Sequence, residues 1–223
     1  MRKWSVDEFE GLIRHQLTDC DGLSELIAGR IVPLPTDDVL KGWIQLLHQQ
    51  LQRHLTAHPI DDYLVDGCAA SSVTENWVVR SHPLIRLNDH SVLRPSLVLC
   101  SLPISPGELD TATALRPEQV CWALDIRPTD AEDALRVQLY AEGSIAHYWH
   151  YLSDQVALRL HSQPTDVGYQ HRRLLQVGEQ AALAGFPFLR FCLQEPLPLH
   201  FLTCTSQGQR TCLYKKPPLL LCV

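Results

Sequence analysis

Apolar and polar positions alternate along the chain with two different periods, which predict helices and strands. Apolar residues at helical spacing follow Ser5 and Asp38, and short apolar runs between turn-forming residues predict strands. The predicted helices cover residues 5–18, 37–58 and 129–143. The predicted strands are two short segments within 23–34 and residues 62–69, 76–87, 91–100, 120–126, 145–152, 155–162 and 169–177.

Capping signals and one apolar stripe support the three helices. Ser5 and Glu8 have the spacing of a capping box, and so do Thr129 and Glu132. The middle helix is predicted from apolar residues that recur close to the helical period, namely Leu40, Trp43, Ile44, Leu47, Leu51 and Leu55.

The segment 120–152 predicts a strand, a helix and a second strand, and therefore one parallel crossover in an otherwise antiparallel sheet. The strand 120–126 (VCWALDI) is almost wholly apolar, as is typical of a strand buried on both faces of its sheet. The predicted fold class is mixed α/β or α+β. We expect one domain over residues 1–195 and a C-terminal tail over residues 196–223, where the pattern weakens.

Composition and charge exclude several classes of protein. The 223 residues are 45% hydrophobic and 20% charged, which argues against collagen-like and disordered chains. The net charge of −6 lacks the overall basicity of a non-specific nucleic-acid binder, although residues 155–223 carry +4. Fifteen of the 19 cations are Arg, so contacts to phosphate or carboxylate would be mostly forked.

The chain shows no sign of a membrane or secreted location. No run of 18 apolar residues occurs, and the N-terminus lacks the apolar core of a signal peptide. The eight Cys form no C-x-x-C pair and lie mostly in apolar runs. We therefore expect free, mostly buried thiols in a reducing cytoplasm, and no zinc site.

Several segments resemble, in the same order, the Uma-two family of restriction-endonuclease-like proteins in the PD-(D/E)XK nuclease superfamily. The likeness runs over about residues 4–195, and LYAEGSIAHYW is its most specific piece. It implies a mixed central sheet flanked by helices and a Mg²⁺-dependent DNA endonuclease. The segments that carry it are KWSVDEFEGL, LSELIAGRIVPLP, PLIRLNDHSVLRPSLVLC and WALDIRPTDAEDALRVQLYAEGSIAHYWHYL.

The resemblance implies a nuclease site that this chain does not carry intact. In the family, the Asp of "PD" and the Glu of "IEV" hold Mg²⁺, and a Lys on the next helix assists the attacking water. Here Ser96 stands at the Asp position, Asp125 at the Glu position and Arg136 at the Lys position. Glu25 matches an early acidic residue of the family. Asp125 and Glu25 are therefore the candidate metal ligands.

Two functions remain open on these residues. One is a DNA endonuclease with a variant site of Asp125, Glu25 and Arg136; it requires both carboxylates within reach of one metal ion. The other is a catalytically silent module, as a monomer or a homodimer, that binds DNA or a partner protein, since Arg136 cannot act as a base and Ser96 is a poor metal ligand.

Each candidate also has a structural interpretation. Asp125 can accept backbone N–H groups at the end of its strand. Arg136 can pair with Glu132 one helical turn earlier, and Glu25 can be a solvated hairpin residue. His147 and His150 lie three apart in a strand, so they face opposite sides and cannot share a metal.

Overall fold

The computed structural model describes most of the chain, and every structural statement below concerns these residues. The described residues are 2–15, 17, 23–34, 38–57, 75–103, 114–127, 132–153, 155–183, 186–193, 200–204 and 210–212.

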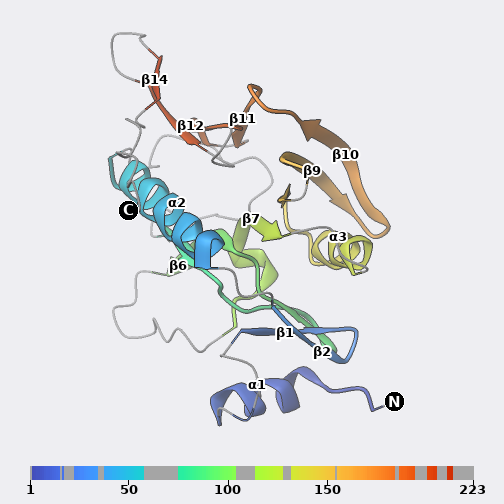
Figure 1. Ribbon diagram of the computed structural model, residues 1–223. Helices are drawn as coiled ribbons and strands as arrows, with labels where there is room; N and C mark the ends of the chain where they lie inside the picture. Colours follow the sequence, from blue (N-terminus) through green and yellow to red (C-terminus); the bar gives the residue numbers. More distant parts are fainter. Residues whose placement is uncertain are drawn as a thin grey trace, which may run out of the picture.

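Three α-helices and fourteen strands are seen in this part of the chain (Figure 1). The helices are α1 (Val6–Arg14), α2 (Asp38–Ala57) and α3 (Asp133–Glu142), with a short 3-10 turn, η2 (Pro117–Gln119). The strands are β1 (Ser24–Ile27), β2 (Arg30–Pro33), β3 (Glu75–Ser81), β4 (Ile85–Asn88), β5 (Ser91–Leu93), β6 (Leu97–Pro103), β7 (Val120–Arg127), β8 (His147–Leu152), β9 (Ala157–Thr165), β10 (Gly168–Leu175), β11 (Gln180–Leu183), β12 (Phe186–Cys192), β13 (His200–Cys204) and β14 (Arg210–Cys212).

The described strands form three sheets. A six-stranded sheet has the order β10-β9-β8-β7-β6-β3, and a four-stranded sheet has the order β2-β1-β5-β4. The third sheet has the order β11-β12-β13-β14. β7 and β8 pair in parallel and are joined through α3, whereas the other pairs of the six-stranded sheet are antiparallel. This confirms the predicted single crossover.

The six-stranded sheet is covered on both faces. One face packs against α2 and β11–β12, with Trp122 of β7 wholly buried at its centre. The other face packs against α3 and the four-stranded sheet, and α1 covers the far side of that smaller sheet. All eight residues of β7 are buried, as the nearly continuous apolar run predicted.

Local sequence signals explain the first two helices and the first hairpin. The Ser5–Glu8 capping box of α1 is confirmed in both directions. Four residues of the predicted α2 stripe are buried, with exposed fractions of 6% or less: Ile44, Leu47, Leu51 and Leu55. Ala28 and Gly29 both have positive φ, 49° and 81°, as the tight turn between β1 and β2 requires.

Two predicted strands were wrong, because each one is broken by a proline. The segment 76–87 divides at Pro83 into β3 and β4, and the segment 91–100 divides at Pro95 into β5 and β6. Proline lacks the N–H group that a strand ladder needs. The chain therefore passes twice between the four-stranded and six-stranded sheets. The two crossings are joined by a hydrogen bond of 3.2 Å from the His82 N–H to the Ser96 carbonyl.

The start of α3 also differs from the prediction. Glu132, which was expected inside the first turn, is the N-cap residue and makes no side-chain capping bond. Thr129 lies outside the described residues. The helix ends at Gly143 as predicted.

The predicted strand 62–69 lies outside the described residues. β4 and β5 form an antiparallel hairpin in which Asn88 pairs with Ser91. Phe191 of β12 pairs with Phe201 of β13, so strand pairing continues past residue 195. The division into a domain and a tail stays a prediction.

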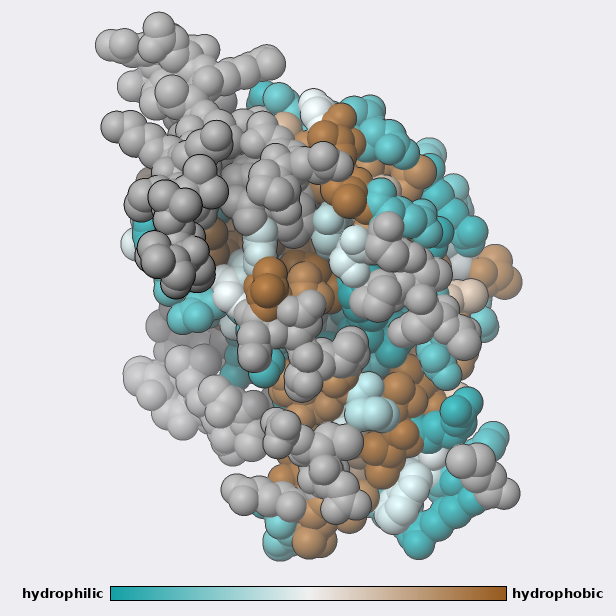
Figure 2. Space-filling view, in the orientation of Figure 1, coloured by the Kyte–Doolittle hydropathy of each residue, from teal (hydrophilic) through white to brown (hydrophobic). Residues whose placement is uncertain are grey.

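The surface of β10 is strongly polar. This strand lies at the edge of the six-stranded sheet, and its five consecutive residues 170–174, which include Arg172 and Arg173, are exposed. Figure 2 shows hydrophilic side chains along the upper right of the molecule, where β10 lies in Figure 1. Charged side chains on an edge strand disfavour pairing with another chain.

Three cysteines in the described part of the chain, Cys100, Cys121 and Cys192, are buried, as predicted. No helix in the described part is long and apolar enough to cross a membrane.

His161 on β9 is a buried titratable group within the aromatic packing under α3. Its ring lies 5.5 Å from that of Tyr148 and 5.6 Å from that of Tyr169, and the residue is 6% exposed. Burial lowers the pKa of His161 to about 4, and the nearby Arg172 charge adds to this effect. The folded state therefore favours the neutral imidazole.

We expect the free energy of unfolding to fall as the pH drops from about 6.5 to about 4, because the unfolded chain binds a proton at His161 more readily. His161→Phe should remove this contribution, at most about 3 kcal/mol at the acid end. Urea unfolding of the natural chain and the variant at several pH values would measure the difference. Parallel pH dependences for the two proteins would contradict the assignment.

Candidate functional site

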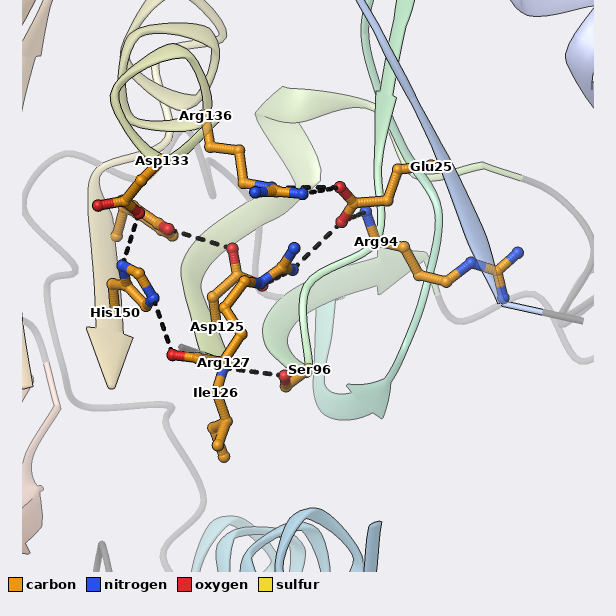
Figure 3. Close-up of polar contacts among 10 residues, drawn as sticks. Glu25, Arg94, Ser96, Asp125, Ile126, Arg127, Asp133, Arg136 and His150 are labelled. Atoms are coloured by element: carbon orange, nitrogen blue, oxygen red, sulfur yellow. Dashed lines mark hydrogen bonds and ion pairs between the residues drawn. The ribbon is translucent and has the colours of Figure 1, made fainter. Parts of the chain in front are cut away.

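A cluster of charged side chains lies buried between β1, β7 and α3. Asp125 and Arg127 are two residues apart on β7, so both point to the same face of the sheet, toward α3. Glu25 of β1 and Arg136 of α3 meet them there (Figure 3). All four side chains are almost inaccessible to solvent, with Glu25 and Asp125 at 0% exposure.

Arg127 lies between the two carboxylates. Its Nη2 atom donates to Asp125 Oδ1 at 2.6 Å and to Glu25 Oε1 at 3.2 Å. One guanidinium nitrogen therefore bridges the two acids (Figure 3).

The remaining carboxylate oxygens also have donors. Arg136 donates to Glu25 Oε2 through Nη2 at 2.9 Å and through Nε at 3.2 Å. The Tyr148 hydroxyl donates to Asp125 Oδ2 at 3.1 Å, and the Arg94 backbone N–H lies 3.4 Å from Glu25 Oε1. Two negative and two positive charges thus compensate each other in the interior.

The electrostatics of the cluster favour the charged forms of both arginines. Burial by itself lowers the pKa of Arg127, but the charges of Asp125 and Glu25 outweigh it and hold the pKa well above its ordinary value. The pKa of Arg136 is raised in the same way, with Glu25 opposing the effect of burial. Burial and the Asp125 charge together raise the pKa of Tyr148 well above its ordinary value, so its hydroxyl keeps the proton that it donates.

A second group of charges adjoins the first. His150, paired with Asp125 across β7 and β8, has its Nδ1 atom 2.7 Å from Asp133 Oδ1 and its Nε2 atom 3.3 Å from the Arg127 carbonyl. Arg159 donates to the other Asp133 oxygen at 2.9 Å. These contacts tie the start of α3 to β8 and β9.

The structure brings three of the four predicted site residues together. Glu25, Asp125 and Arg136 converge on one cluster, and the expectation that Glu25 is a solvated hairpin residue was wrong. Ser96 lies beside the cluster, where its Oγ accepts the Ile126 N–H at 3.0 Å (Figure 3). His147 and His150 lie on opposite faces of β8, as predicted.

The side chains of this cluster do not match a Mg²⁺ site. Mg²⁺ takes carboxylate oxygens and water, whereas each carboxylate oxygen here already accepts from a nitrogen or hydroxyl donor. The guanidinium of Arg127 fills the space between Asp125 and Glu25 that a shared ion would need. Among the described residues, no group of three or more His, Cys, Asp or Glu side chains is placed to hold a metal.

Sequence reasoning missed Arg127 and Tyr148. The spacing of Arg127 from Asp125 was the available signal, since residues two apart on a strand share a face. Arg127 adds a second charge on the same face of a buried strand as Asp125. Because a buried charge needs a partner of opposite sign, this spacing indicates an ion pair. The Tyr148 contact had no comparable signal, because it depends on the parallel register of β7 and β8.

The fold defines the class of this protein as a mixed α+β protein. No family model and no curated protein matches the chain. Its structure is similar to that of a protein from Anabaena variabilis ATCC 29413, described as "a putative nuclease belonging to DUF820". The TM-score is 0.57, the sequence identity is 14%, and the match covers 82% of this chain and 90% of that one. This likeness confirms the predicted fold class.

We expect Arg127→Met to lower the free energy of unfolding by about 3–5 kcal/mol, because it leaves buried carboxylates without their shared cation. Arg173→Met is the matched control, since Arg173 forms an exposed pair with Glu179 at 3.4 Å and should cost at most about 1 kcal/mol. Urea unfolding at neutral pH, followed by tryptophan fluorescence, would measure both values. Equal losses in the two variants would contradict a structural role for the cluster.

Proposed function

We propose that this chain is a DNA-binding protein on the nuclease fold that does not cleave its ligand. The observation that carries the proposal is the position of Arg127, whose Nη2 atom bridges Asp125 and Glu25. In this arrangement the two acids serve the stability of the fold.

The chemical requirements of phosphodiester hydrolysis support the proposal that this chain does not cleave DNA. Metal-assisted cleavage of a phosphodiester needs a cation that neutralises developing charge and activates water. Both candidate ligands are fully buried and paired with arginine. Arg136 cannot take a proton from water, since contact with Glu25 keeps its pKa above the already high ordinary value despite burial.

DNA is the partner that the fold suggests. The structurally similar protein from Anabaena variabilis is described as a nuclease, and a fold can keep a binding surface after its catalytic groups are lost. The many arginines of this chain are suited to forked phosphate contacts.

Incubated with supercoiled plasmid and Mg²⁺ or Mn²⁺, the purified chain should leave the plasmid intact. An active nuclease in the same buffer serves as the positive control, and agarose electrophoresis gives the readout. Nicking that disappears in both Glu25→Gln and Asp125→Asn would overturn the proposal, because it would assign catalysis to these carboxylates.

We expect DNA binding to weaken steeply with salt. If three phosphates are contacted, the affinity should fall by about 40-fold between 50 and 200 mM salt. Gel-shift titrations with a short duplex at several salt concentrations would measure the slope. The absence of a shift at low salt, or an affinity independent of salt, would contradict DNA as the ligand.

A further inference from the structure

The outer part of the six-stranded sheet carries a polar groove on the face opposite to the charge cluster. The groove has a volume of about 340 Å³, which is space for on the order of ten water molecules. It lies over β8, β9 and β10 and reaches β11. The described residues that line it are His147, Trp149, Leu160, His161, Ser162, His171, Arg172, Arg173 and Ala182.

Strand register decides which of these side chains point into the groove. Ser162 of β9 pairs with His147 of β8 on one side and with His171 of β10 on the other, so the three residues form one row across the sheet. Arg173 lies two residues from His171 and therefore on the same face. Two imidazoles, a hydroxyl and a guanidinium thus line the groove, and all of these groups can donate hydrogen bonds to phosphate oxygens.

The positive charge on this surface has little compensation. Residues 170–178 contain Arg172 and Arg173 but no Asp or Glu. Arg173 forms an exposed pair with Glu179 at 3.4 Å, and Arg172 has no acidic partner in the described part of the chain. The two guanidinium groups belong to opposite faces of β10 and therefore flank the edge of the sheet. A polyanion that lies along this edge could contact both.

Protection of the sheet edge explains only part of this arrangement. Charged side chains on β10 are sufficient to disfavour pairing with another chain. The row formed by His147, Ser162 and His171 behind them has no role in such protection, because two of its three members lie on inner strands. A groove with hydrogen-bond donors, next to uncompensated arginines, is instead suited to an anionic ligand.

We propose that DNA binds on this surface, with one backbone phosphate in the groove and the duplex along the edge strand β10. The inference rests on the proposed function and gives DNA binding a place on the fold. Asp125 points to the other face of the sheet, toward α3 (Figure 3). The sheet therefore separates DNA bound in the groove from the carboxylates of the charge cluster, which agrees with binding without cleavage.

Gel-shift titration of the full chain with a short duplex at about 50 mM salt tests the surface with two double variants of equal charge. Arg172→Gln with Arg173→Gln should weaken binding at least about tenfold and reduce the steepness of the salt dependence by about two phosphate contacts. Arg2→Gln with Arg116→Gln removes two arginines from exposed ion pairs elsewhere and should keep the affinity within about threefold. Equal losses in the two double variants would overturn the assigned surface.

A pair of substitutions at Ser162 tests the groove itself. Ser162→Asp places a negative charge between the two imidazoles and should weaken DNA binding at least about tenfold, because it repels a phosphate. Ser162→Asn is neutral and of nearly equal size, so its affinity should stay within about threefold of that of the natural chain. Tryptophan fluorescence checks that each variant is folded. Equal affinities of the two folded variants would overturn the placement of a phosphate in the groove.

Failure of this inference and failure of the proposed function give different results. If the natural chain does not shift the duplex at low salt, DNA binding itself is refuted and the proposed function fails. If the natural chain binds DNA and the loss of Arg172 and Arg173 has no effect, the proposed function stands and only this surface is refuted. Plasmid nicking by a chain that loses DNA binding with Arg172 and Arg173 would support the surface and refute the absence of cleavage.

Discussion

The interior of this protein depends on the guanidinium of Arg127, which joins two buried carboxylates from distant parts of the chain. Glu25 on β1 and Asp125 on β7 are a hundred positions apart, and a single nitrogen atom contacts both. Arg136 adds a contact from α3 to Glu25. One charge-compensated cluster therefore connects the sheet that contains β1, the six-stranded sheet and the crossover helix α3. Burying such a cluster costs desolvation energy. Its contribution lies in fixing the relative positions of the strands and the helix that carry its side chains.

The two prolines decide where this cluster can form. Pro83 and Pro95 end strands of one sheet and send the chain into the other, and the His82–Ser96 backbone hydrogen bond holds the crossings together. Near these crossings Glu25 of β1 and Arg127 of β7 are in contact. The same crossings place Arg94, Ser96 and His82 around a small pocket that Arg127 of the cluster also lines.

The relation between fold and chemistry follows from this arrangement. The fold is similar to that of a protein described as "a putative nuclease", at 14% identity. Yet positive groups occupy the position where metal-assisted hydrolysis needs a metal ion between two acids. Positive charge can attract a phosphate group by itself, but it supplies no activated water. Binding without cleavage is therefore the function that we propose for this set of residues.

The sequence by itself determined the elements that depend on local physics: the capping box at Ser5, the apolar stripe of α2, the buried strand β7 and the parallel crossover. It also indicated Glu25, Asp125 and Arg136 as one group, through a family resemblance. Only the tertiary structure decided that Arg127 lies between the two acids, that Tyr148 binds Asp125, and that the strands divide at Pro83 and Pro95 between two sheets. The reason is physical. Periodicity and capping act within a few residues, whereas the partner of a buried charge is set by sheet register and by the approach of segments far apart in the chain.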